Sequence, residues 1–113
     1  DDGLDEISPY AKTNVVQLKN NEIKEIEIEP NKLNVNASNF QNLVGSDSKF
    51  NANKIIEIFK GDDNDFSKAV CLNAAAGLIV SEKYSAFDEA YEVSRKNILS
   101  GKVIDYLKTI QNV

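Results

Sequence analysis

The segment AVCLNAAAGLIV, residues 69–80, is apolar at every position except Asn73. A helix without a polar face belongs at the centre of a fold, because each of its sides must be covered by a neighbouring element. The small residues at positions 74–77 allow such neighbours to approach closely. The segment therefore predicts a central helix that runs from about Asp65 to Lys83.

A β-hairpin is predicted upstream of this helix, over residues 14–29. Its strands, NVVQLK and EIKEIEIE, are joined by Asn20-Asn21, a pair that tolerates the positive φ angles of a tight turn. Ile23 is out of step with the isoleucines that follow it, which predicts a bulge near Lys24-Glu25. The glutamates of the second strand predict one water-facing side near a sheet edge.

Two helices are predicted between the hairpin and the central helix. A short one over residues 37–44 is expected to be capped by Asn36 or Ser38, and a longer one covers residues 48–60. The acidic segment 62–65 supplies the N-cap of the central helix and a negative charge at its positive end. The predicted apolar stripe of the longer helix consists of Phe50, Ile55, Ile56 and Phe59.

Two more helices are predicted after the central one. Ser85-x-x-Asp88 resembles a capping box and opens the first of them. Ser100-Gly101 ends it, and apolar residues at helical spacing then predict a short amphipathic helix.

The patterns together predict an α/β fold class, with one antiparallel β-hairpin followed by about four helices. We assign residues 1–113 to one domain, with a loop over 1–12 and a helical region over 37–111. A lone hairpin is marginally stable in water, and the sequence begins with Asp1 and contains no methionine. We therefore expect a processed or truncated chain that forms the C-terminal part of a larger α/β domain.

Composition excludes several chemistries. The absence of histidine excludes Ser-His-Asp and Cys-His catalysis and histidine zinc sites, and the single cysteine, Cys71, excludes an internal disulfide. The five glycines are too far apart for a glycine-rich phosphate loop. The net charge of −5 argues against a nucleic-acid partner, and no apolar stretch is long enough to span a membrane. We expect a cytoplasmic chain.

One stretch combines chemical groups with a tight loop, namely DDGLDEIS at residues 1–8. Its adjacent carboxylates, Asp5 and Glu6, are hard oxygen ligands. They suit Mg²⁺, which takes one or two carboxylates together with waters and substrate phosphates. Acidic pairs on loops are also common as solvated surface, so the residues alone leave both interpretations open.

Several short motifs follow one another in a characteristic order. They are DGLDEIS (2–8), IEP (28–30), GSD (45–47), NA (51–52), LNAAA (72–76) and SGK (100–102). In this order and spacing they resemble the C-terminal portion of the anthranilate phosphoribosyltransferase family. The sequence departs from the family pattern at Ser46, where a second glycine is usual, and at Phe50, where glutamate is usual.

The resemblance implies a glycosyltransferase of tryptophan biosynthesis. This family transfers the phosphoribosyl group of 5-phosphoribosyl 1-diphosphate (PRPP) to the amino nitrogen of anthranilate and releases pyrophosphate. By resemblance, Asp5 and Glu6 bind the Mg²⁺ associated with PRPP. The family's PRPP loop, its anthranilate-binding residues and its homodimerisation domain belong to upstream sequence. We thus expect no catalytic residue and no turnover from this chain alone.

Two alternatives remain: a non-enzymatic interaction domain, and a paralogue of the same fold such as a nucleoside phosphorylase. Among the other residues, we interpret Asn73 as a buried amide that satisfies backbone groups. Cys71 is interpreted as a small core residue. The tyrosines are expected to show ordinary half-buried packing.

Overall fold

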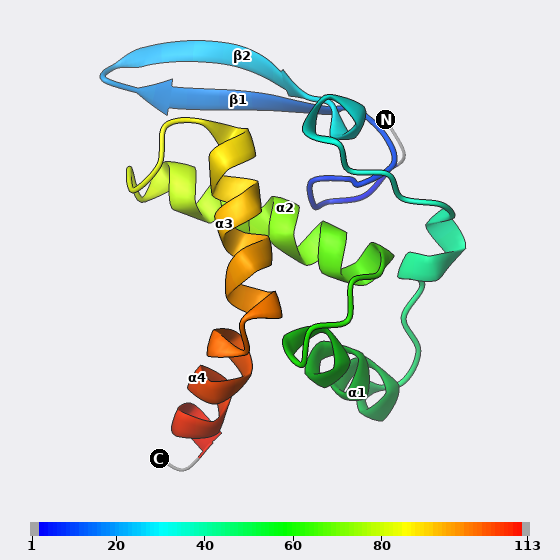
Figure 1. Cartoon of the computed structure of the whole chain (residues 1–113). Helices are drawn as coiled ribbons and strands as arrows, with labels where there is room; N and C mark the ends of the chain where they lie inside the picture. The colour runs from blue at the N-terminus through cyan, green and yellow to red at the C-terminus, as the bar shows by residue number, and fades with distance from the viewer. Residues whose placement is uncertain (1–2, 112–113) are drawn as a thin grey trace.

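The computed structural model describes residues 3–111 (Figure 1). Within this range the chain forms one two-stranded sheet, two 3₁₀ turns and four α-helices, which confirms the predicted α/β class. The elements are β1 (Thr13–Lys19), β2 (Glu22–Ile28), the 3₁₀ turns Pro30–Leu33 and Phe40–Leu43, α1 (Ser48–Phe59), α2 (Asp65–Val80), α3 (Phe87–Leu99) and α4 (Lys102–Gln111).

Strands β1 and β2 form an antiparallel hairpin closed by a two-residue turn. The register is continuous from Thr13, which pairs with Ile28, to Lys19, which pairs with Glu22. The turn residues Asn20-Asn21 have φ angles of 53° and 62°. These left-handed values are what a tight hairpin turn requires, so the predicted hairpin is confirmed.

The predicted bulge near Lys24-Glu25 is wrong. Residues pair one to one along the hairpin, so β2 contains no extra residue. Ile23 keeps the strand alternation by lying on the face opposite Ile26. There it pairs with Leu18, and both side chains are 72% exposed. An isoleucine out of step with its neighbours thus marks a second apolar face of the hairpin.

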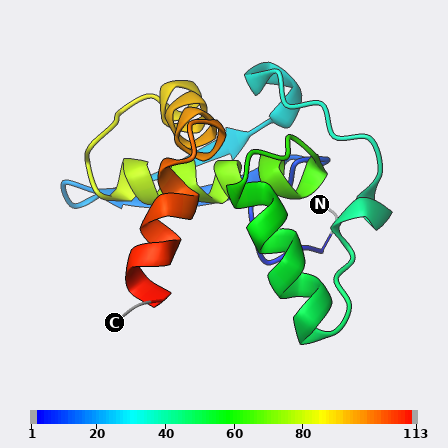
Figure 2. The ribbon, with the colours of Figure 1, turned by 60° about the horizontal axis from the view of Figure 1, so that its bottom comes forward.

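Helix α2 lies between the hairpin on one side and α1 and α4 on the other, and α3 crosses it (Figures 1 and 2). Its buried residues Cys71, Leu72 and Ala75 pack with residues of α3 to form the core. The rest of the buried core consists of Val35, Ile58, Ala90, Tyr91 and Ile98. The central position of the predicted helix is confirmed, although α2 ends at Val80 and its Val80 side chain is 81% exposed.

The apolar stripe predicted for α1 is wrong in part. Ile58 is the buried residue of this helix, whereas Phe50 and Ile55 are 39% and 48% exposed. Apolar residues lie on more than one side of α1, so periodicity alone did not show which side packs inward. The helix begins at the N-cap Asp47, whose side chain accepts a hydrogen bond from the Phe50 N–H at 2.8 Å.

Two predicted helix starts are also wrong. The segment predicted as a helix over 37–44 contains only the 3₁₀ turn Phe40–Leu43, capped by the side chain of Asn39 rather than Asn36 or Ser38. Ser85 does not cap α3, because the N-cap is Ala86 and it makes no side-chain cap hydrogen bond. The capping box found in the structure opens α2, where Asn64 and Ser67 exchange side-chain hydrogen bonds with each other's backbone N–H groups.

Candidate functional site

Asp5 and Glu6 lie side by side on the loop that precedes β1, and both are exposed to solvent. Asp1 and Asp2, from the same acidic stretch, lie outside the described residues. Over residues 3–111 no group of three or more acidic, cysteine or histidine side chains is close enough to hold a metal ion. The described part of the loop therefore offers two carboxylate ligands.

The loop is attached to α2 directly after the acidic pair. The Ile7 N–H donates to Asn73 Oδ1 at 3.0 Å, and Asn73 Nδ2 donates to the Ile7 carbonyl at 3.1 Å. The same nitrogen donates to the Ala69 carbonyl one turn earlier in α2 at 2.9 Å. Asn73 is half-buried, and its amide satisfies backbone groups as the sequence predicted.

A turn at Ser8 reverses the chain toward β1. Ser8 is buried, and its Oγ accepts hydrogen bonds from the N–H groups of Tyr10 and Ala11 at 3.0 and 3.1 Å. The Ser8 N–H donates to Thr13 Oγ1 at 3.2 Å. Serine hydroxyls stabilise turns in this way by occupying nearby backbone donors. The loop thus passes from Ile7 into the first strand along a defined path.

Asp65, the first residue of α2, holds the end of the loop and the segment before α1. Its Oδ2 accepts hydrogen bonds from the Ser38 N–H and Oγ at 3.1 and 3.0 Å and from Asn42 Nδ2 at 2.9 Å. The Tyr10 hydroxyl donates to the same oxygen at 3.0 Å, and Lys68 Nζ lies 2.9 Å from Oδ1. The buried carboxylate therefore joins three segments that are distant in sequence.

These hydrogen bonds and the burial of the site shift the pKa values of Asp65 and Tyr10. Burial opposes the charged form of Asp65, but the donors from Asn42, Lys68 and Ser38 outweigh it and hold the pKa of this carboxyl well below its usual range. Burial and the hydrogen bond to Asp65 raise the pKa of Tyr10 to about 12. At neutral pH the contact is therefore between a neutral phenol and a carboxylate.

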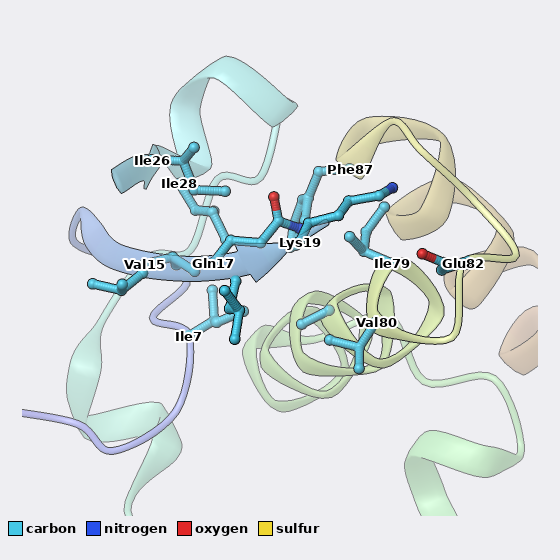
Figure 3. A pocket seen from close by; sticks show the side chains of 13 residues that line it. Ile7, Val15, Gln17, Lys19, Ile26, Ile28, Ile79, Val80, Glu82 and Phe87 are labelled. Atoms are coloured by element: carbon cyan, nitrogen blue, oxygen red, sulfur yellow. The ribbon is translucent and has the colours of Figure 1, made fainter. Parts of the chain in front are cut away.

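Two hollows flank Ile7. One lies beside the acidic pair and is lined mainly by apolar side chains, namely Leu4, Ile7, Leu43, Phe66, Ala69 and Val70, with Glu6 and Asn73. The other lies between the inner face of the hairpin and the C-terminal half of α2, and its lining includes Val15, Ile28 and Ile79 (Figure 3). The hollow beside the acidic pair is mainly apolar, whereas the hollow beside the hairpin also contains the polar side chains of Gln17, Lys19 and Glu82.

Other residues singled out by the sequence have structural roles. Cys71 is buried in the core, and burial raises its pKa to about 11, so it remains a thiol at neutral pH. The expectation of half-buried packing holds for Tyr10 and Tyr84. It is wrong for Tyr91, which is 5% exposed and belongs to the core, and for Tyr106, which is 67% exposed. The contact of Tyr10 with Asp65 was also missed, because no local pattern indicates a partner 55 residues away.

The donor set fits a magnesium ion better than a metal with soft ligands. Asp5 and Glu6 provide hard oxygen atoms, and Mg²⁺ prefers one or two carboxylates while it retains waters or substrate phosphates. Exposure of the pair leaves room for those additional ligands. The attachment of Ile7 to α2 holds the backbone beside the pair in one position.

Residues 1–104 match the model of a protein family described as "Glycosyl transferase family, a/b domain". Because this match covers most of the chain, the protein belongs to that family of glycosyl transferases. Within residues 3–111, no helix is both long and apolar enough to cross a membrane.

The chain is similar to several anthranilate phosphoribosyltransferases. It is 68% identical over 113 residues to the one from Pelagibacter ubique (strain HTCC1062). This alignment covers 100% of the chain and 34% of the Pelagibacter protein. It is 38% identical over 114 residues to the one from Azospirillum brasilense. This alignment covers 98% of the chain and 32% of the Azospirillum protein. The chain thus spans about a third of the length of the curated relatives it matches.

The fold is also that of part of a solved structure. The crystal structure of anthranilate phosphoribosyltransferase from Thermus thermophilus matches with a TM-score of 0.86 and 22% sequence identity. The match covers 96% of this chain and 32% of that chain. At this identity the likeness establishes the shared arrangement of hairpin and helices.

Proposed function

We propose that this chain is part of a transferase that moves the phosphoribosyl group of PRPP to anthranilate. The products are N-(5-phosphoribosyl)anthranilate and pyrophosphate, in tryptophan biosynthesis. One observation carries the proposal: an exposed Asp5-Glu6 pair lies on an anchored loop, in a chain 68% identical along its whole length to an anthranilate phosphoribosyltransferase.

Asp5 and Glu6 are the residues that would hold Mg²⁺. When bound, Mg²⁺ neutralises the negative charge that develops on the departing pyrophosphate and helps to orient PRPP. The two carboxylates supply the protein ligands, and their exposure leaves them accessible to a phosphorylated substrate. Neither carboxylate needs to act as a nucleophile or a base in this role.

The experiment is a turnover assay on the full-length protein that carries this chain. The double variant Asp5→Asn/Glu6→Gln keeps the size of both side chains and removes their charges. We expect turnover with PRPP, Mg²⁺ and anthranilate to fall about 100-fold, since loss of a residue that only orients metal ligands already lowers metal affinity or activity by about 10- to 100-fold. Full activity in this variant would show that the pair is solvated surface.

A matched control removes the same charges elsewhere. Glu25 on the hairpin and Asp62 before α2 are both exposed. The double variant Glu25→Gln/Asp62→Asn should retain the activity of the unaltered protein. The isolated 113-residue chain should show no turnover, and product formation above background by it would contradict that part of the proposal.

The second candidate is a non-enzymatic interaction domain. It is favoured by the outer face of the hairpin, where Val16, Leu18 and Ile23 are all largely exposed. Exposed apolar faces of this kind mark contact surfaces. The two candidates differ in the turnover assay, because an interaction domain would show no dependence of product formation on Asp5 and Glu6.

A further inference from the structure

We propose that Asn73 is a positioning residue for the acidic pair. Its side-chain amide holds the backbone of Ile7, which directly follows Asp5 and Glu6, and so sets the place from which the two carboxylates reach a metal ion. The inference rests on the proposed function, since it takes the acidic pair as the magnesium-binding group.

The contact fixes the peptide unit that Glu6 belongs to. Asn73 Oδ1 accepts from the Ile7 N–H at 3.0 Å, and Asn73 Nδ2 donates to the Ile7 carbonyl at 3.1 Å. The Ile7 N–H lies in the same plane as the Glu6 carbonyl and Cα, because the peptide bond is planar. Two hydrogen bonds on one residue therefore restrict rotation of the chain immediately beside the Glu6 side chain.

Asn73 is itself held in one orientation. Its Nδ2 also donates to the Ala69 carbonyl at 2.9 Å, so Oδ1 and both Nδ2 hydrogens have partners. The adjacent Leu72 is fully buried, which fixes this turn of α2 against the core. The position of Ile7 is thereby tied to the most buried helix of the described chain.

Asparagine is a costly residue for this position. In a helix interior it is less favourable than alanine, because its side chain competes for backbone hydrogen bonds. Positions 74, 75 and 76 of the same helix are all alanine. The amide at position 73 has a partner that alanine could not bind, and that partner is the loop of the acidic pair.

Asn51 offers a matched control. Its side chain makes the same two-bond contact, with Oδ1 accepting from the Ser46 N–H at 3.0 Å and Nδ2 donating to the Ser46 carbonyl at 3.2 Å. Asn51 is exposed at the start of α1, and the loop it holds carries neither Asp5 nor Glu6. Its removal breaks a similar pair of hydrogen bonds away from the acidic pair.

The test uses the full-length protein with Asn73→Leu, Asn73→Asp and Asn51→Ala. Leucine removes both contacts with Ile7, while aspartate keeps an acceptor for the Ile7 N–H and loses the donor. In both Asn73 variants the Mg²⁺ concentration for half-maximal activity should rise about tenfold, the lower end of the effect seen when a residue that orients metal-binding groups is lost. At saturating Mg²⁺, kcat should return to within about twofold of the original value.

Direct binding of Mn²⁺, measured by electron paramagnetic resonance in the presence of PRPP and without anthranilate, supplies a readout other than activity. The Mn²⁺ dissociation constant should rise about tenfold in Asn73→Leu and Asn73→Asp and stay unchanged in Asn51→Ala. An Asn73→Asp protein that folds and binds Mn²⁺ as Asn51→Ala does would overturn the inference.

Asp5→Asn/Glu6→Gln separates this inference from the function beneath it. If that variant binds Mn²⁺ normally, the acidic pair is not the metal site and both proposals fall. If it loses Mn²⁺ binding while both Asn73 variants retain it, the proposed site stands and the role of Asn73 alone is wrong. Loss of Mn²⁺ affinity in both sets, with Asn51→Ala unaffected, supports both.

Discussion

Asn73 and Asn51 make the same contact in two different regions of the molecule. Each uses one amide to bind the N–H and the carbonyl of a single backbone residue, Ile7 for the first and Ser46 for the second. The first contact joins residues 66 positions apart and is partly buried, whereas the second joins residues five positions apart and is exposed. One contact organises tertiary structure, and the other shapes a local loop.

Sequence separation and burial distinguish the two contacts. The Ser46 loop can reach only a short distance from α1, and its backbone groups can bind water if Asn51 is lost. The same geometry also places the Asn51 amide so close to Gly45 that a Cβ there would lie 2.8 Å from Asn51 Oδ1. The Ile7 segment lies 66 positions from Asn73, so no short chain connection holds it beside α2, and its partly buried backbone groups depend on the Asn73 amide for hydrogen bonds.

The largest expected difference in stability is between Asn73→Ala and Asn51→Ala. Removing Asn73 leaves partly buried backbone groups of Ile7 without partners, which costs about 2 kcal/mol of unfolding free energy. Removing Asn51 exposes groups that water can satisfy, and we expect a loss below about 1 kcal/mol. Urea unfolding of the chain measures both values, and equal losses would remove the distinction between the two contacts.

A further effect is expected from pH, through Asp65 and the hydrogen bond that it accepts from Tyr10 at the end of the loop. The pKa of Asp65 is held below its usual value, so its ionised form stabilises the fold above the unfolded-state pKa of about 4. This contribution is lost as pH falls below about 4 toward the folded-state value, because the unfolded chain then binds the proton first. Stability should therefore fall with acidification in this window.

Asp65→Asn isolates that contribution. The variant should be less stable near neutral pH, and its stability should depend less on pH below about 4 than that of the unaltered chain. Urea midpoints between about pH 2 and 6 measure the two slopes. Identical slopes would show that Asp65 does not hold the loop through its charge. The Asn73 contact involves no ionisable group and should not contribute to either slope.

Local signals in the sequence were sufficient for the hairpin and for the central helix. Asn20-Asn21 indicated the hairpin turn, and the apolar segment 69–80 indicated the central helix. These features depend on neighbours in sequence. The start of α3 was misassigned because Ser85 resembles a cap, yet the Asp88 carboxylate accepts a hydrogen bond from the adjacent Glu89 N–H instead.

The sequence indicated which residues belong to the candidate site, but it did not indicate the contacts that these residues make. Asp5 and Glu6 were found from adjacency and resemblance, and their metal-binding role stays a prediction. Asn73 was interpreted as an amide that binds backbone, but its partner lies 66 residues away and no local pattern names it. The cluster around Asp65 was missed for the same reason, since Tyr10 and Ser38 are 55 and 27 residues distant.

Amide hydrogen exchange at Ile7, followed by NMR on the chain and its Asn73→Leu and Asn51→Ala variants, measures whether Asn73 holds the loop of the acidic pair. If the Asn73 amide holds the loop that carries Asp5 and Glu6, the Ile7 N–H is protected in the original chain and in Asn51→Ala. It then loses that protection in Asn73→Leu, while core amides such as that of Leu72 remain protected. An Ile7 N–H that exchanges freely in the original chain, or equally slowly in all three proteins, would show that Asn73 does not hold this loop.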